Sequence, residues 1–68
     1  MKVTYYRDTD TAHLEFTDHP VRETREITEN IYVDIDDQGN VVSMTIEHAR
    51  ANANLWEFSY QEIPRKTA

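Results

Sequence analysis

Strict two-residue alternation across residues 31–49 constrains the fold of this chain more than any other feature. Apolar and polar residues alternate through residues 31–36 and again through residues 42–47, which is typical of strands with one buried and one solvent-exposed face. The segment between them contains Gly39, the only glycine in the chain. Glycine reaches positive φ without steric cost, so a glycine between polar residues marks a tight turn. The stretch therefore predicts a β-hairpin.

A second hairpin is predicted before the first. Residues 2–7 and 12–17 alternate in the same way, and a polar turn at residues 8–11 joins them. Pro20 then breaks the pattern, because proline cannot donate to a strand ladder. Residues 23–28 carry five charged or hydroxyl side chains and one apolar side chain, which favours an irregular edge strand. Residues 29–30 form a small turn or bulge, in which Asn30 tolerates left-handed geometry.

The last part of the chain, from residue 50 on, has a different composition. Residues 50–54 are rich in alanine and permit a helical turn or two. Aromatic side chains then alternate with polar ones, which predicts a last strand over residues 55–60. Pro64 ends it, and residues 65–68 are expected to form a frayed tail. We expect residues 1–68 to form one domain of the mainly β (α+β) class: an antiparallel sheet of four to five strands with one short helical segment near the C-terminus.

The small size of the chain limits its core. A domain of 68 residues buries only about 60% of its unfolded surface, and such folds usually need disulfides, a metal or a partner subunit. The chain has no cysteine, so we expect a homodimer. The expected core consists of alternating inward side chains: Val3, Tyr5, Leu14, Phe16, Ile27, Ile31, Val33, Ile35, Val42, Met44, Ile46, Trp56 and Phe58.

Charge and hydropathy exclude two classes of partner. The net charge is −6 and the basic residues are scattered, which argues against direct nucleic-acid binding. No apolar run reaches the roughly 20 residues that a membrane helix needs, and no signal segment opens the chain. The absence of cysteine fits a cytoplasmic protein. The acidic surface favours a small basic protein as partner.

The chain also resembles a known family over residues 1–50. The likeness rests on the opening MKVTYY, the pattern Asp8-x-Asp10-x-Ala12-x-Leu14-x-Phe16, and the segments ETREI at 23–27, IYVDID at 31–36, GNVV at 39–42 and IEHA at 46–49. These features are similar to the small prokaryotic domain-of-unknown-function family numbered twenty-two eighty-three. That family has no established activity. Some of its members look like neighbours of small toxin-like proteins, so the resemblance implies an antitoxin-like role for some of them.

Three histidines are the candidate metal ligands: His13, His19 and His48. His13 and Glu15 share a strand face and could chelate jointly, but a catalytic zinc site needs three converging ligands and the spacing identifies no third. As alternatives, His13 is a surface cross-strand partner and His48 a hydrogen-bonded residue at a strand end.

Two acidic turns, at Asp8/Asp10 and at Asp34/Asp36/Asp37, could share a cation only if they lie at one end of the sheet. Counting from Asp34, the twelfth position is Thr45 instead of the bidentate Glu of a calcium loop. We therefore expect ordinary polar turns and no metal or cofactor.

Catalytic signatures are missing from the sequence. It has no cysteine, no Gly-x-Ser-x-Gly motif and no glycine-rich phosphate loop, so we predict that the protein is not an enzyme. The aromatic side chains are more informative, since a small sheet cannot hide them all. We predict an interface on five of them, with cross-strand stabilisation as the alternative for those on the sheet: Tyr6, Tyr32, Trp56, Phe58 and Tyr60.

Three functional hypotheses follow. The first is a non-enzymatic protein-binding module, of the antitoxin-like type. The second is a metal- or small-molecule-binding protein that uses His13, Glu15 and the acidic turns. The third is a structural homodimer subunit of a larger assembly.

Overall fold

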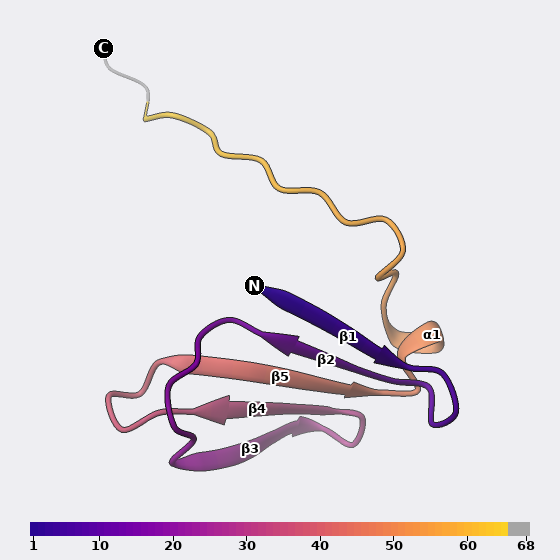
Figure 1. Cartoon of the computed structure of the whole chain (residues 1–68), viewed down its shortest axis with the longest axis horizontal. Coiled ribbons are helices and arrows are strands. Elements are labelled where there is room, and N and C mark those ends of the chain that lie inside the picture. The colour runs from indigo at the N-terminus through magenta and orange to yellow at the C-terminus, as the bar shows by residue number, and fades with distance from the viewer. Residues whose placement is uncertain (66–68) are drawn as a thin grey trace.

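The computed structural model describes residues 1–65, and its main feature is one five-stranded antiparallel sheet (Figure 1). The spatial order of the strands is β1-β2-β5-β4-β3. Their bounds are β1 Lys2–Tyr6, β2 Thr11–Glu15, β3 Glu23–Thr28, β4 Ile31–Ile35 and β5 Val41–Glu47, followed by the short helix α1 at Ala49–Asn52. The mainly β fold with a short helix is therefore confirmed.

The last strand, β5, occupies the centre of the sheet. The hairpins β1–β2 and β3–β4 flank it on either side, and β5 pairs with β2 and with β4. Residues 16–22, which we call the crossover, connect β2 to β3 at the opposite edge (Figure 1). Two segments far apart in sequence, β2 and β5, thus become hydrogen-bonded neighbours.

Strand register divides the sheet into two chemically different faces. Val3, Leu14, Met44 and Val33 lie in one row across β1, β2, β5 and β4, and a parallel row consists of Tyr5, Ala12, Ile46 and Ile31. We call this side the apolar face. Because successive side chains point to opposite faces, the next row, Thr4, His13, Thr45 and Tyr32, belongs to the other side.

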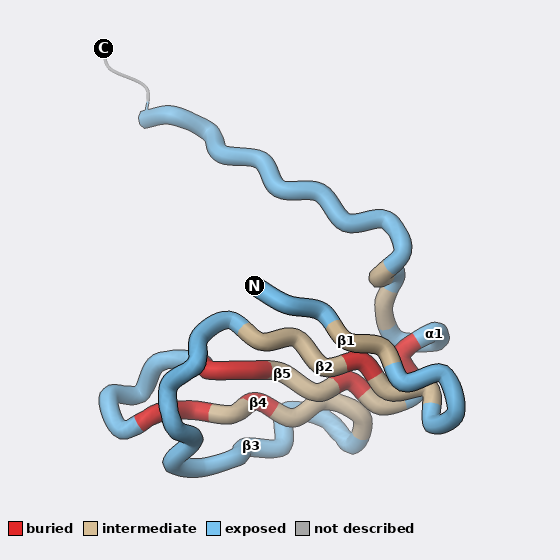
Figure 2. Tube along the Cα trace, in the orientation of Figure 1, coloured by how far each residue is buried: buried red, intermediate tan, exposed pale blue. Residues whose placement is uncertain are grey.

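The core lies on the apolar face beside α1. Ala12, Ile46 and Ala49 form its buried cluster, and six partly buried residues pack against them: Tyr5, Leu14, Ile31, Met44, Ala53 and Leu55. None of the large side chains in residues 1–65 is fully buried. Figure 2 shows the buried positions on β2, β4, β5, the first residue of the β4–β5 turn and the start of α1. One helix of four residues leaves much of the face without a second layer.

The predicted last strand is wrong. Residues 55–60 form no strand; residues 55–63, which we call the arm, run away from the sheet in an extended path (Figure 1). Side-chain alternation alone cannot make a strand, because a strand also needs a neighbour for its backbone hydrogen bonds. Trp56 and Phe58 are consequently exposed and do not belong to the core.

Three further core predictions are also wrong. Ile27 lies at a bulge in edge strand β3 and is exposed. Val3 and Phe16 are exposed as well, because no second layer covers the apolar face at either position. Ala12 and Ala49 are fully buried instead, since only a small side chain fits where α1 meets the sheet.

The turns lie where the sequence predicts them, but the residues with left-handed backbone geometry differ in part from the prediction. Gly39 has φ 81°, as the hairpin prediction requires, whereas Asp10 and His48, and not Asn30, adopt the left-handed conformation. The helical turn begins at Ala49, one residue earlier than predicted, and ends at Asn52. Residues 66–68 of the predicted tail lie outside the described residues. Within the described part, no helix is long and apolar enough to cross a membrane.

Candidate functional site

The face opposite the core, which we call the acidic face, carries carboxylates from four strands. The register places Glu15, Glu26, Asp34 and Glu47 on this face, together with Tyr6 and Tyr32. Lys2 is the basic side chain in the same rows. Burial raises the pKa of Tyr32, and the nearby carboxylates of Glu47, Glu26 and Glu29 raise it further. The pKa of this hydroxyl thus reflects its burial first and the negative potential of the face second.

The crossover forms a pocket at one end of the acidic face. Its volume is about 360 Å³, and its walls are His13, Glu15, Thr17, Asp18, His19, Val21, Asp34, Val42 and Ser43. Strands β2, β4 and β5 supply the floor, and residues 17–21 supply the roof. Three carboxyl groups line the pocket without a lysine or arginine among the lining residues. Its chemistry therefore suits a cationic group.

Backbone hydrogen bonds fix the crossover over the sheet. The amides of Phe16 and Thr17 donate to the Val42 carbonyl at 2.8 and 3.2 Å. At the other end, the Arg22 amide donates to the Ile35 carbonyl at 2.8 Å. Both ends of the pocket roof are thus attached to β4 and β5, which gives the pocket a defined shape.

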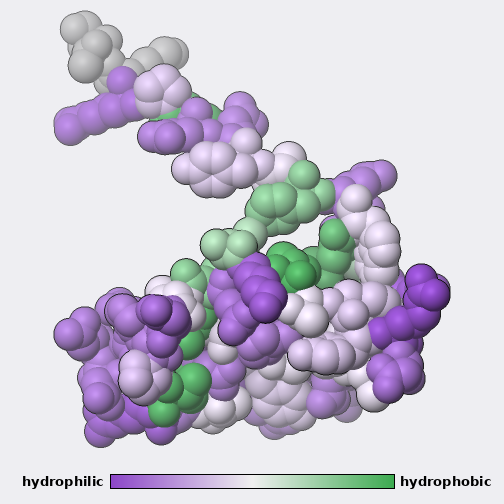
Figure 3. Space-filling view, in the orientation of Figure 1, coloured by the Kyte–Doolittle hydropathy of each residue, from purple (hydrophilic) through white to green (hydrophobic). Residues whose placement is uncertain are grey.

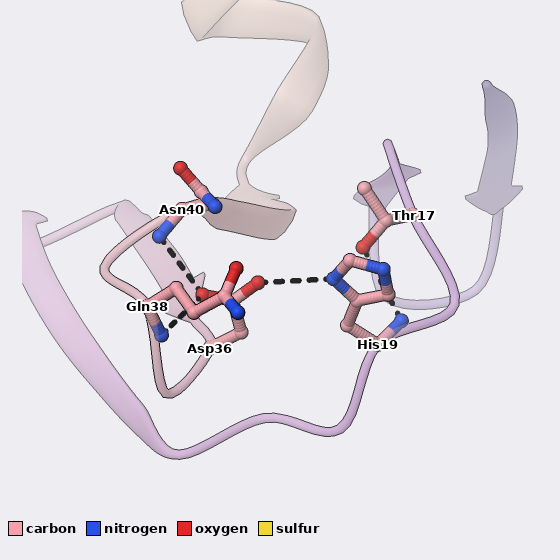
Figure 4. Close-up of polar contacts among 5 residues, drawn as sticks. All are labelled: Thr17, His19, Asp36, Gln38 and Asn40. Atoms are coloured by element: carbon pink, nitrogen blue, oxygen red, sulfur yellow. Dashed lines mark hydrogen bonds and ion pairs between the residues drawn. The ribbon is translucent and has the colours of Figure 1, made fainter.

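A side-chain contact between His19 and Asp36 holds the middle of the crossover. His19 Nδ1 lies 3.0 Å from Asp36 Oδ2, and the other carboxylate oxygen accepts the amides of Gln38 and Asn40 at 2.9 Å each (Figure 4). The hydrogen bond from His19 lowers the pKa of Asp36, and the two backbone amides lower it further against the effect of burial. The β4–β5 turn and the crossover thus share one carboxylate.

Asp34 forms a second polar cluster on the pocket wall. Ser43 Oγ donates to Asp34 Oδ2 and Thr24 Oγ1 donates to Oδ1, both at 2.6 Å. Burial raises the pKa of Asp34, but these two hydrogen bonds and the nearby His13 outweigh it, so the pKa lies below its ordinary value. Asp34 consequently stays ionised and contributes a fixed negative charge to the pocket at neutral pH.

Each of the three predicted ligand histidines has a different hydrogen-bond partner. His13 Nδ1 is 3.2 Å from Thr45 Oγ1 on the neighbouring strand, and His48 Nδ1 is 3.0 Å from Asn30 Oδ1, as the alternative interpretations expected. His13 and Glu15 do share the pocket wall. Within residues 1–65, no group of three histidine, cysteine or carboxylate side chains converges to hold a metal ion.

The two acidic turns lie at opposite ends of β5. Thr11, which follows the first turn, pairs with Glu47 at the end of β5, whereas the second turn precedes Val41 at its start. A shared cation site between them is therefore excluded. Asp10 instead accepts the Tyr5 hydroxyl at 2.7 Å and the Arg50 amide at 3.3 Å.

The five aromatic residues of the predicted interface fall into two groups. Tyr6 and Tyr32 lie on the acidic face, where Tyr6 is exposed and Tyr32 donates to the Glu29 carbonyl at 3.3 Å. Trp56, Phe58 and Tyr60 lie on the arm and are exposed. A single interface cannot easily use both groups on one chain, because they occupy different surfaces.

Several residues of the pocket are absent from the sequence predictions. Ser43 lines the pocket and, together with Thr24, donates to Asp34, and His19 contacts Asp36; the sequence predicts none of these contacts. The signal for Ser43 exists in the hairpin register, which places it opposite Asp34. The pairing of His19 with Asp36 has no local signal, because it depends on the path of the crossover.

These features define a small, acidic, single-sheet protein with a cation-compatible pocket. The chain belongs to the family described as protein of unknown function (DUF2283), whose profile matches residues 2–50. That segment includes all five strands, the crossover and the pocket, so the candidate site is part of the family's domain. Neither a curated protein nor a solved structure matches the chain.

Proposed function

We propose that this protein is a non-enzymatic protein-binding module that takes a cationic segment of a partner on its acidic face. The observation that carries this proposal is the pocket beneath the crossover, which Glu15, Asp18 and Asp34 line without a lysine or arginine among the lining residues. A lysine or arginine side chain of the partner would enter this pocket. Its aliphatic stem would contact Val21 and Val42, which line the same cavity.

The rest of the acidic face extends the binding surface. Tyr32 is surrounded by Glu26, Glu29 and Glu47, and Tyr6 is exposed on the same side. Aromatic rings attract guanidinium and ammonium groups, and an acidic field speeds the association of a basic protein. The net charge of −6 acts in the same direction.

The surroundings of the serine on the pocket wall support a role in binding. Ser43 Oγ donates a hydrogen bond to the Asp34 carboxylate, and His13, on the same pocket wall, lies 3.2 Å from Thr45 Oγ1. A serine nucleophile needs a base that can accept its proton, normally a histidine. This arrangement suits a fixed polar wall better than a nucleophile.

The partner that charge and family resemblance both favour is a small basic protein of the toxin-like type. In this role the acidic face would cover cationic residues of the partner and keep them from their own target. A complex between the two proteins would therefore be strongest at low ionic strength.

Calorimetric titration with an oligolysine peptide tests the acidic pocket directly. A double variant, Glu15→Gln with Asp18→Asn, should weaken binding roughly tenfold, which corresponds to about 1.4 kcal/mol. The matched control, Glu57→Gln with Glu62→Gln on the arm, removes the same two charges and should change affinity less than about twofold. Equal weakening by both variants would contradict a defined site, because net charge alone would then explain binding.

A second candidate is a protein that binds a small molecule or a metal ion through His13 and Glu15. The observation that favours it is their shared position on the wall of a pocket whose volume falls within the usual range for ligand sites. Zinc titration of untagged protein, followed through the His13 imidazole signals by NMR, tests this function. Unshifted His13 signals at stoichiometric zinc would contradict metal binding there.

A further inference from the structure

The apolar face and the arm are the two hydrophobic surfaces that the acidic pocket does not use. On the face, α1 covers only one end, and Val3 and Phe16 remain exposed at the other positions. On the arm, exposed fractions are 57% for Trp56, 63% for Phe58 and 82% for Tyr60. A monomer would keep all of these groups in water, which is unfavourable for apolar surface of this extent.

The root of the arm is attached firmly to its own chain. Trp56 meets the Tyr5 ring edge-to-face with centroids 5.1 Å apart, and the Arg50 guanidinium lies 5.7 Å from the Trp56 ring and 5.9 Å from the Tyr5 ring. Arg50 Nε also donates to the Tyr5 hydroxyl at 3.1 Å. These contacts set the direction in which the arm leaves the sheet.

Beyond Trp56 the arm points away from its own sheet. Figures 1 and 2 show it extended and exposed along its length. A hollow of about 490 Å³ lies at its root, lined by Arg50, Ala53, Asn54 and Trp56, and hydrophobic atoms border the gap between arm and sheet in Figure 3. The arm therefore reaches a second body more readily than its own apolar face.

We propose that a second copy of this chain is that body, and that the two copies pack apolar face against apolar face with their arms exchanged. In this dimer, Phe58 and Tyr60 of each copy cover the apolar face of the other. Each chain carries both the donor arm and the receiving face, so a two-fold axis satisfies both sets at once. The outward acidic faces stay free.

Area and charge both favour a second copy as the occupant. A buried aromatic side chain removes about 150–250 Å² from water, so Phe58 and Tyr60 of two arms, added to two sheet faces, exceed the roughly 1,200 Å² of a stable interface. The distribution of charge also favours packing of the two copies through their apolar faces. The charged side chains that the register places on the apolar face are Glu23 and Arg25, which pair with each other at 2.9 Å. Two copies with net charge −6 thus avoid repulsion by meeting on this side.

Light scattering coupled to size exclusion, across a dilution series of the full chain, gives the first test. The expected mass is about 16 kDa, twice the 8.0 kDa of one chain. Phe58→Glu should raise the dimer dissociation constant roughly 30-fold or more, as loss of a central aromatic contact does. Ser59→Glu adds the same charge one residue along, on the other side of the extended arm, and should have a clearly smaller effect.

Arm exchange itself needs a readout that a simple face-to-face dimer would not give. In a mixture of isotope-labelled and unlabelled protein, intermolecular NOEs should connect the Phe58 ring to the methyl groups of Leu14 and Val33. A stable 8 kDa species would overturn the proposal, and so would a dimer whose arm contacts are only intramolecular. Equal effects of Phe58→Glu and Ser59→Glu would overturn arm exchange as well. None of these outcomes bears on peptide binding at the acidic face, so the two proposals fail independently.

Discussion

The variant Ser43→Ala isolates one hydrogen bond of the pocket wall. Ser43 is buried, with 3% exposure, and its hydroxyl donates to Asp34 Oδ2 at 2.6 Å. A hydrogen bond to a charged group contributes about 1.5–3 kcal/mol. Asp34 is only half-buried and keeps its second donor, Thr24, at 2.6 Å, so water and Thr24 reduce the loss. We expect the free energy of unfolding to fall by about 1–2 kcal/mol at pH 7.

The loss should depend on pH with a definite sign. The folded-state pKa of Asp34 lies below its ordinary value, so its ionisation stabilises the fold above the unfolded-state pKa of about 3.9. That contribution disappears as the pH falls through the folded-state pKa. Ser43→Ala raises the folded-state pKa, and the free-energy difference between the two proteins should therefore be largest above about pH 5 and decrease as the pH falls below the unfolded-state pKa.

Urea unfolding followed by far-UV circular dichroism measures this difference at pH 7 and at pH 3. Protein concentration is held constant, because the stability of an associating protein depends on it. On heating, a loss of about 1–2 kcal/mol lowers Tm by about 4–16 °C for a domain of this size. Ser59→Ala, on the exposed arm, is the matched control and should change stability by less than about 0.5 kcal/mol. A Ser43→Ala loss that is the same at both pH values would refute the role of the ionised Asp34.

Three further predictions concern the crossover contact, the turn and the core. His19→Ala removes the hydrogen bond that most lowers the pKa of Asp36, so the NMR titration midpoint of that carboxyl, and with it the acid limb of unfolding, should move to higher pH; an unchanged midpoint would contradict the contact. Gly39→Ala should lose about 1–2 kcal/mol because the residue has φ 81°, and Gly39→Asn should lose less in the same urea measurement; equal losses would argue against left-handed strain. Ile46→Val in the buried cluster should lose about 0.5–1.5 kcal/mol, whereas Ile27→Val at the exposed bulge should lose less than about 0.5 kcal/mol, and a reversed order would refute the assignment of the core.

Local sequence was sufficient to predict both hairpins. The alternation through residues 31–36 and 42–47, interrupted by Gly39, contains the strand length, the turn and the register in one continuous segment. The first two strands have the same property, because residues 8–11 join them directly. The mainly β class follows from these segments, and the short helix follows from the alanine-rich residues 50–54.

Strand order could not be predicted in the same way. Pairing of β2 with β5 joins residues 28 to 36 positions apart in sequence, from Glu15–Ser43 to Thr11–Glu47, and no turn connects the two strands. The pocket depends on that pairing and on the path of the crossover. Glu15 and Asp34 were therefore identifiable as polar strand residues, but their convergence in one cavity was not.

One residue and one segment show that side-chain alternation can predict the wrong structure. Asp36 continues the polar phase of its strand, yet only 6% of it is exposed, because its side chain folds back to accept amides from its own turn. The arm alternates as a strand does, yet within the described residues no strand of its own chain pairs with it. In both cases hydrogen-bond partners, and not side-chain periodicity, decided the structure.

The central position of β5 has a consequence for how the chain folds. The hairpins β1–β2 and β3–β4 do not pair with each other and meet only through β5, which is the last strand to leave the ribosome. An isolated two-stranded hairpin is at best marginally stable in water, so the first 40 residues should remain two fluctuating hairpins during synthesis. Insertion of β5 between them then completes both halves at once, and the sheet should appear in a single cooperative step.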